Sequence, residues 1–405
     1  MAESALAGIR IVEFAVFAAG PVVSKHLANY GAEVIRVESH LNPDGFRAHY
    51  PPFAGNQPGL DRSGCFALFN DGKLGVTLNL KTPEGIDLAK RLVARADVVI
   101  ENFTPGTLNR LGLGYEALRA VRPDLVMLSS CNMGQTGPYA HHPGFGSMLS
   151  SLGGFTNLTG YPGEVPLLNY GPYIDFVAVG YGVIAVLAAL DYRRRTGEGQ
   201  YIDLAQYENG LQFVAPALLD YEVNGRLPER WGNRSPYAAP HGAFPCRGDD
   251  AWCTISVTCD TEWEALRRAI GDPAWAADPR FATLLGRKAH EDELEARLAD
   301  WTRARTPREV METLQAAGVA SAVVNTMADL YTDPQLAYRH YWWELPHAAL
   351  GLFHYQAGGF TLSDTPAEFS RPSPLLGEHN DYVFRDLLGL PEAEYQALLE
   401  RKVIY

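Results

Sequence analysis

The chain has little of what marks several common protein classes. Its 405 residues include five cysteines, and no two of them stand at the C-x-x-C spacing typical of zinc and redox sites. Acidic residues outnumber basic ones, and the formal net charge of −13 disfavours a protein that binds nucleic-acid phosphates. We therefore expect a cytoplasmic protein with reduced thiols, no metal site and no nucleic-acid partner.

Nucleotide-binding fingerprints are absent as well. No G-x-G-x-x-G follows the first predicted strand, and no G-x-x-x-x-G-K-[ST] occurs in the chain. The sequence therefore does not support binding of NAD or ATP in the usual way. The opening residues, MAESALAGIRIVEF, also lack the charged-then-apolar layout of a signal peptide, so we expect none.

One long apolar segment is present, Asn169–Leu190, and it raises the question of a membrane span. Its uninterrupted apolar part, Phe176–Leu190, is shorter than the ~20 residues that a transmembrane helix needs. Asp175 and Asp191 flank this part on either side. We therefore expect a buried helix in a protein without a membrane partner, and the small residues in it predict close packing of another backbone.

The first 130 residues alternate between predicted strands and predicted helices. Strands are expected at Ile9–Phe14, Glu33–Glu38, Leu74–Leu80, Asp97–Phe103 and Asp124–Ser130, with a further short strand at Gln200–Leu204. Helices are expected at about 18–30, after the Thr82 cap, and at about 115–121. This alternation predicts an α/β fold with a mostly parallel sheet, whose ligands lie beyond the carboxyl ends of the strands.

The composition changes near Gly225, where turn-forming residues become frequent. Strands at Trp252–Thr258 and Val319–Asn325, with helices at about 261–270, 290–304 and after the capping box at Thr306, predict a smaller α/β domain. After about residue 335 the chain is rich in aromatic residues, and it ends in a predicted helix at 380–401. We therefore divide the chain into residues 1–224, 225–334 and 335–405.

Asp175 is the most conspicuous candidate for chemistry. A carboxylate in the first turn of a helix complements the helix dipole, and the local pattern by itself favours that structural role. The alternative is a nucleophile or base in a dry site, where burial raises the carboxyl pKa and the helix N-terminus lowers it. Such a balance would leave the group ionised at neutral pH but poorly solvated.

The wider sequence decides between these readings. Asp175 precedes the segment Ala188-Ala189-Leu190, Arg193–Arg195 and Thr196-Gly197-Glu198-Gly199-Gln200, and this arrangement resembles the family III CoA-transferases. Further stretches resemble the same family in the same order: Leu6–Phe14 leading to Ala19-Gly20-Pro21, Gly31–Ile35 with Glu38, Leu80–Gly85, Glu101–Gly106 with Arg110 and Gly112, and Pro374–His379. The resemblance extends over nearly the whole chain.

The resemblance implies both an architecture and a reaction. It implies an interlocked homodimer whose large Rossmann-like domain is built from both ends of the chain, with a small domain between them. It also implies that Asp175 attacks an acyl-CoA thioester to give an aspartyl anhydride, that CoA then forms an aspartyl thioester, and that a carboxylic acid takes the CoA. Coenzyme A is then a substrate, and no tightly bound cofactor is expected. Apolar surroundings would protect the anhydride from water.

The resemblance also assigns contacts to CoA. These are Ala18 and Ala19 after the first strand, Leu78, Asn79, Leu80 and Lys81 after the third, Asn102, Phe103 and Thr104 after the fourth, and Arg110. Taken individually, Arg110 is more typical of a solvated surface and Phe103 of a core. A flat side chain beside the adenine is the functional alternative for Phe103.

Some positions depart from the family pattern and leave rival functions open. The α-methylacyl-CoA racemases resemble this chain but add a proton-carrying His at the position of Phe145, and His141 and His142 are out of register, so transfer is favoured over racemisation. A non-catalytic subunit of the same fold is a third possibility, but it would be expected to lack Asp175, which is present here.

Ser39 and residues 143–146 also depart from the family pattern, so their contacts stay open. The glycine run of formyl-CoA transferases is absent, so oxalate and formate are not expected as substrates.

The acceptor acid is the least determined part of the prediction. The aromatic segment 338–355 is typical of a core or dimer interface, and its alternative role is a pocket for a bulky acid. We expect a dicarboxylic or aromatic acid as acceptor, with succinyl-CoA or acetyl-CoA as donor.

Overall fold

The computed structural model describes residues 4–405, and these form two compact units. The larger unit contains the described residues up to Phe155, together with Leu168–Gly225 and Gln335–Tyr405. The smaller unit contains Thr156–Leu167 and Arg226–Pro334. Each unit has its own hydrophobic core.

The larger unit is built on a six-stranded sheet in the order β3-β2-β1-β4-β5-β6. The strands are β1 (Arg10–Phe14), β2 (Glu33–Glu38), β3 (Leu74–Thr77), β4 (Val98–Glu101), β5 (Val126–Cys131) and β6 (Tyr201–Ala205). Every neighbouring pair is parallel, which confirms the predicted parallel sheet. From β1 the chain first adds β2 and β3 on one side of the sheet, and then β4, β5 and β6 on the other side. Open sheets of this kind bind ligands at this change of side, between β1 and β4.

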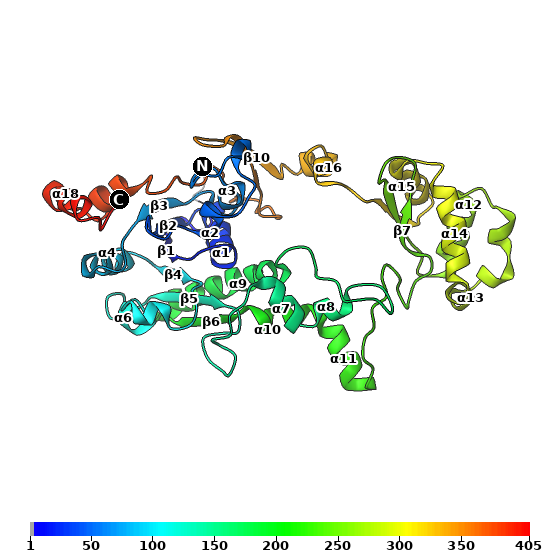
Figure 1. Cartoon of the computed structure of the whole chain (residues 1–405), viewed down its shortest axis with the longest axis horizontal. Helices are drawn as coiled ribbons and strands as arrows, with labels where there is room; N and C mark the ends of the chain where they lie inside the picture. Colours follow the sequence, from blue (N-terminus) through cyan, green and yellow to red (C-terminus); the bar gives the residue numbers. More distant parts are fainter. Residues whose placement is uncertain (1–3) are drawn as a thin grey trace. The chain divides into compact units, whose positions relative to one another are not determined.

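Helices cover both faces of this sheet, because successive strand residues point to opposite sides. Val12 belongs to a core shared with α4 (Pro83–Val93), α6 (Tyr115–Arg119) and α18 (Glu392–Glu400). Its neighbour Ile11 belongs to a second core shared with α1 (Ala19–Asn29) and α9 (Tyr173–Thr196). Figure 1 shows these two groups of helices on either side of the strands.

Helix α9 contains the long apolar segment, and only one of its faces is buried in this chain. Its buried face packs on the sheet and on α1, where a Cβ on Gly182 would lie 2.8 Å from Val23 Cγ2. The predicted close approach of another helix is therefore confirmed. The opposite face leaves large apolar side chains such as Ile184 and Leu187 exposed, so the prediction of a buried helix holds for only one face in a single chain. By length and composition α9 could also cross a membrane.

The C-terminal segment returns to the edge of the sheet. It first forms a hairpin of β10 (Trp342–His347) and β11 (Gly351–Gln356). Next, His379 Nδ1 accepts a hydrogen bond from the Gly75 amide, and Asn380 Oδ1 accepts one from the Thr77 amide, so this segment borders β3. The helix predicted at 380–401 is interrupted. A π-helical turn, Asp381–Leu387, is separated from α18 by Gly389 in the left-handed conformation.

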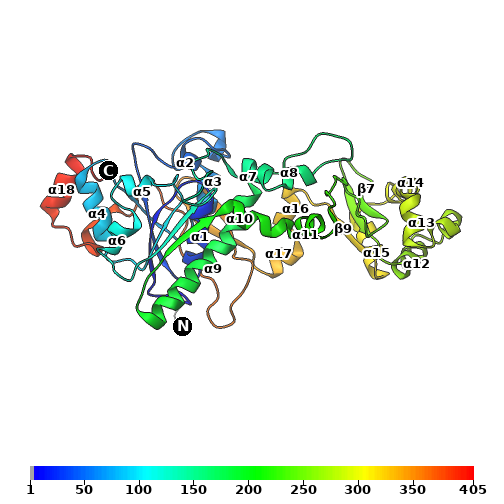
Figure 2. The same ribbon diagram turned by 90° about the horizontal axis from the view of Figure 1, so that it is seen from below.

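The smaller unit is an antiparallel sheet of β7 (His241–Pro245), β8 (Trp252–Ser256) and β9 (Ala320–Val323), covered by helices. Its main helices are α12 (Asp260–Ala269), α13 (Leu284–Ala289), α14 (Glu291–Thr302) and α15 (Pro307–Ala316). The predicted capping box of Thr306 and Glu309 is present at the start of α15. Figure 2 shows these elements from a second direction.

Short helices complete the chain. They are α2 (Gly45–Ala48), α3 (Gly64–Asn70), α5 (Thr107–Arg110), α7 (Gly146–Leu152), α8 (Phe155–Leu158), α10 (Gln206–Leu211), α11 (Ala215–Asn224), α16 (Met327–Tyr331) and α17 (Pro334–Tyr338). Two of them, α7 and α8, lie in the region 132–172 that the sequence indicates as a long loop.

Candidate active site

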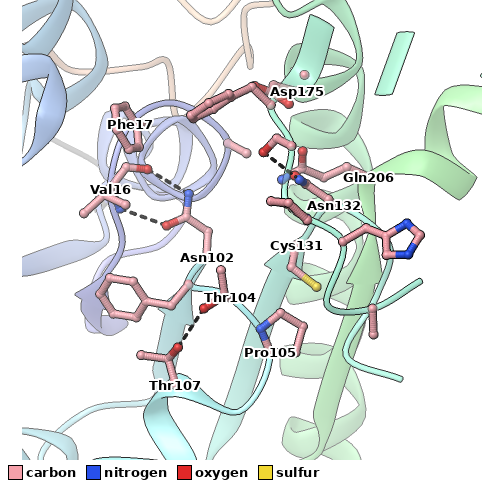
Figure 3. A pocket seen from close by; sticks show the side chains of 18 of the residues that line it. Val16, Phe17, Asn102, Thr104, Pro105, Thr107, Cys131, Asn132, Asp175 and Gln206 are labelled. Atoms are coloured by element: carbon pink, nitrogen blue, oxygen red, sulfur yellow. Dashed lines mark hydrogen bonds between the residues drawn. The ribbon is translucent and has the colours of Figure 1, made fainter. Parts of the chain in front are cut away.

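A cavity of about 580 Å³ lies in the larger unit at the carboxyl ends of β1, β4, β5 and β6. Its walls come from the segments that directly follow these four strands, from the loop at residues 140–146, and from Asp175 at the start of α9. The cavity thus spans the reversal of strand order between β1 and β4, as expected for a ligand site in such a sheet. Figure 3 shows the cavity with Asp175 at one end.

Asp175 lies in the first turn of α9 and faces this cavity. Burial raises the pKa of its carboxyl group from 3.8 to about 7, and no charged neighbour within residues 4–405 offsets the effect. The expectation of a fully ionised carboxylate at neutral pH is therefore too simple, because burial outweighs the helix N-terminus. The carboxyl group is thus poorly solvated, and its ionised form is disfavoured relative to that of an exposed aspartate.

Two glycines allow neighbouring helices to approach the start of α9. A Cβ on Gly146, the first residue of α7, would lie 2.5 Å from Asp175 Oδ1. A Cβ on Gly210 in α10 would lie 2.7 Å from the Ile174 side chain. Both distances are shorter than real Cβ contacts, so a side chain at either position would force its neighbours to move. The departure from the family pattern at Gly146 thus places a backbone, rather than a side chain, against the carboxylate.

The loop after β1 is held in an unusual conformation. Phe17 has a φ of 59°, which a non-glycine residue rarely adopts, and its amide donates to Asp44 Oδ2 at 2.9 Å. Asn102 fixes the same loop from the other side, because its carboxamide both accepts from the Val16 amide and donates to the Val16 carbonyl. These bonds position Ala18 and the first turn of α1 at the cavity.

The segment after β4 supplies a further part of the cavity wall, which includes Phe103 and Thr104. The Phe103 amide donates to Glu101 Oε2 at 2.8 Å, and burial raises the pKa of the Glu101 carboxyl to about 7. Arg110 also lines the cavity, and its Nη2 donates to Thr107 Oγ1 at 2.9 Å. Arg110 is the one described lining residue with a permanent positive charge.

Most of the predicted site residues gather in this cavity, but one group does not. Ala18, Ala19, Asn102, Phe103, Thr104, Arg110 and Asp175 all line it. Leu78, Asn79, Leu80 and Lys81 follow β3 at the far edge of the sheet and do not line the cavity. Leu78 is fully buried in the core, so its side chain is not accessible to a ligand.

Several lining residues do not appear among the predicted site residues. Cys131 and Asn132 stand at the end of β5, Gln206 follows β6 directly, and Phe17 follows β1. The rule that ligands bind at the carboxyl ends of parallel strands, applied to β1, β5 and β6, would have identified them. His141 and His142, set aside as out of register, also line the cavity, and so does Phe145.

The aromatic segment 338–355 does not contribute to this cavity within the chain. Most of it forms the β10–β11 hairpin, in which Tyr355 is buried and Trp343 stacks on Phe369. The alternative of an acceptor pocket is therefore not supported at this cavity.

In the described residues, no group of three His, Cys, Asp or Glu side chains is arranged to hold a metal ion.

Comparison with known proteins adds an independent line of information. The sequence model of CoA-transferase family III matches residues 6–380. Succinyl-CoA–D-citramalate CoA-transferase of Chloroflexus aurantiacus is 36% identical over 396 residues, which cover 98% of this chain and 97% of that protein. Succinate–glutarate CoA-transferase of Agrobacterium fabrum is 35% identical over 383 residues, covering 94% and 95% of the two chains.

Among solved structures, a CAIB/BAIF family protein from Brucella suis superposes with a TM-score of 0.87 at 34% identity. The match covers 95% of this chain and all of that one.

Proposed function

Since the chain belongs to CoA-transferase family III, we propose that it moves CoA from an acyl-CoA donor to a carboxylic acid through covalent intermediates on Asp175. The observation that carries this mechanism is the position of Asp175. It is a mostly buried carboxyl group, without an ionic partner in the described residues, facing a cavity at the ligand-binding end of the sheet. A carboxylate that is poorly solvated is a good nucleophile.

The chemistry balances in four steps. An Asp175 oxygen attacks the thioester carbonyl, the C–S bond breaks, and CoA leaves as a thiolate while an acyl–aspartyl anhydride forms. The thiolate then attacks the aspartyl carbonyl and releases the donor acid as a carboxylate. The acceptor carboxylate displaces the thiolate from this aspartyl-CoA thioester to form a second anhydride. Finally the thiolate attacks the acceptor carbonyl, which yields the new acyl-CoA and restores Asp175.

The walls of the cavity fit this substrate. The first turn of α1, which begins at Ala19, presents backbone N–H groups and a positive dipole end to a developing thiolate or oxyanion. Phe103 offers a flat apolar surface, and Arg110 offers a cation for a phosphate of CoA. We keep residues 78–81 as contacts to a more distant part of CoA, made through backbone atoms and the exposed Lys81.

We also propose a dicarboxylic acid as acceptor and succinyl-CoA as donor. The support is that the two relatives compared above, named for transfer between succinate or succinyl-CoA and a dicarboxylic acid, match this chain over more than nine-tenths of its length. The aromatic acids of the sequence prediction have less support, since the aromatic segment lies outside the cavity.

Exposed apolar surface supports the homodimer that the family resemblance implies. Helix α11 has no buried residue, and it leaves Leu219 and Val223 exposed at 61% and 74%. The exposed face of α9 adds Ile184 at 64%. Apolar surface of this extent is typical of a protein interface. We also propose that the two chains are interlocked, that the small domain begins at residue 225 and ends before residue 335, and that the protein is cytoplasmic.

The test is a screen of carboxylic acids against succinyl-CoA and acetyl-CoA, with products identified by mass spectrometry. We expect transfer to at least one dicarboxylic acid by the native protein and none by Asp175→Ala, with the dimer intact. Full activity in Asp175→Ala would refute the assignment. Racemisation is distinguished in D₂O: deuterium exchange at Cα of an acyl-CoA without any acceptor acid would favour the racemase over the transferase.

A further inference from the structure

A short strap, residues 143–146, lies against the carboxyl group of Asp175. Its last residue, Gly146, is buried, and a Cβ at this position would lie 2.5 Å from Asp175 Oδ1 and 2.6 Å from Asp175 Cγ. All four residues of the strap line the cavity. The strap is therefore part of what separates the proposed nucleophile from water.

Asn132 ties this strap to the sheet. Its Nδ2 donates to the Gly144 carbonyl oxygen over 2.9 Å. A carbonyl oxygen only accepts, so the nitrogen end of the carboxamide must face the strap. Asn132 directly follows β5 and is itself fixed, because its own carbonyl accepts from the Tyr207 amide at 2.9 Å. Figure 3 shows Asn132 and Asp175 on the same side of the cavity.

A second contact holds the strap from the direction of β1. The ring of Phe145 meets the ring of Phe17 edge to face, with 6.4 Å between the two centroids. Phe17 belongs to the loop after β1 that Asp44 and Asn102 hold in place. Phe145 nevertheless remains 62% exposed. The strap is thus fastened at its middle by one polar and one apolar contact, and either can be removed separately.

We infer that Asn132 is a positioning residue that holds the strap over Asp175 and so directs the activated acyl group to the acceptor acid rather than to water. This inference rests on the proposed aspartyl intermediates and adds how this chain protects them. A site that excludes water prevents hydrolysis of a reactive intermediate.

The competing reaction is hydrolysis of the anhydride. Water attacks its acyl carbonyl, the C–O bond to Asp175 breaks, and the donor acid and Asp175 are both released as carboxylates. Two protons are set free, and the CoA thiolate takes one of them as it leaves as a thiol. The net result is acyl-CoA and water converted to an acid and CoA.

The experiment measures two rates for each protein by mass spectrometry of the products. One is transfer from succinyl-CoA to an active dicarboxylic acid, and the other is hydrolysis of succinyl-CoA without an acceptor, after subtraction of the rate without protein. Asn132→Ala removes the donor to Gly144. Loss of a hydrogen bond of ordinary net strength multiplies the population of a released strap about fivefold, so the ratio of hydrolysis to transfer is expected to rise by about that factor. A merely structural role would lower both rates together and leave the ratio unchanged.

Three further variants sharpen the result. Phe145→Ala removes the apolar contact and is expected to raise the same ratio while Asn132 stays in place. Asn132→Ala combined with Asp175→Ala is expected to abolish the added hydrolysis, because that hydrolysis passes through Asp175. Asn209→Ala is the matched control, since its Nδ2 also donates to a backbone carbonyl, that of Ala205 over 3.0 Å, but it does not line the cavity. This control is expected to keep the native ratio.

An unchanged ratio in folded Asn132→Ala would overturn the inference and leave the transferase function intact. An equal rise in Asn209→Ala, or added hydrolysis that persists without Asp175, would overturn it as well. If Asn132→Ala does not fold, Phe145→Ala decides, and an unchanged ratio there would overturn the role of the strap. Absence of transfer to any acid by the native protein would instead refute the proposed function itself.

Discussion

The burial of Asp175 makes a prediction about stability that does not depend on the identity of the substrates. A buried carboxyl group whose pKa is raised from 3.8 to about 7 opposes folding once it must ionise. Below pH 3.8 the group is protonated in both the folded and the unfolded chain and has no effect. Between pH 3.8 and 7 the unfolded chain ionises while the folded one does not, so the penalty grows. Above pH 7 the penalty is complete.

Its size follows from the shift. About three pKa units, at ~1.4 kcal/mol per unit, correspond to ~4 kcal/mol as an upper limit. Asp175→Asn keeps the shape of the side chain and removes its charge, so it is expected to stabilise the protein by up to this amount above pH 7 and by much less at pH 5. On a scale of about 2 °C per kcal/mol, Tm is expected to rise by several degrees at pH 8.5. The same variant is expected to lack CoA transfer.

Calorimetry of the native protein and the variant at pH 5 and pH 8.5 tests this directly. Asp191→Asn is the matched control, because it changes an exposed aspartate at the other end of α9. Hydrogen bonds from Arg194 and Arg195 lower the pKa of Asp191, so this variant is expected to bring no gain in Tm at pH 8.5. An equal gain for Asp175→Asn at both pH values, or no gain at pH 8.5, would refute the argument from burial.

Three other substitutions test the site and its support. Gly146→Ala brings a Cβ within 2.5 Å of Asp175 Oδ1, so kcat is expected to fall by about tenfold or more while the protein still folds; unchanged kinetics would contradict the packing. Glu101→Ala removes the acceptor of a cavity-wall amide, so KM for acyl-CoA is expected to rise more than kcat falls, and Glu101→Gln is expected to restore it. Lys73→Met leaves the fully buried Glu13 without one of its ionic partners, so the free energy of unfolding measured with urea is expected to fall by ~3 kcal/mol. An unchanged urea midpoint would argue against the buried ion pair.

Much of the larger unit could be predicted from the sequence, because its signals are local. The strand Glu33–Glu38 was predicted with its observed limits, and the Thr82 cap begins α4 as expected. Alternation of strands and helices was enough to predict a parallel sheet. The family resemblance named Ala18 and Asn102, and both line the cavity, although Asn102 uses its polar atoms to hold the Val16 backbone.

The remaining features depend on contacts between distant segments, which no local pattern contains. Gly146 and Asp175 are far apart in sequence, and the lack of room for a side chain at 146 appears only when α7 and α9 are packed together. The bond from Asn132 to Gly144 likewise appears only once the loop between them is in place. The exposed face of α9 could not be predicted from hydropathy, because apolar residues occur on all sides of this helix and no apolar stripe marks its buried face.

The central claim is that Asp175 carries the transferred groups covalently. The most direct measurement is hydroxylamine trapping during turnover with succinyl-CoA and an active acceptor acid, followed by digestion and mass spectrometry. We predict a hydroxamate on the peptide that contains Asp175, formed only when acyl-CoA is present. Continued turnover with that peptide unmodified, or a hydroxamate at a different residue, would contradict the account.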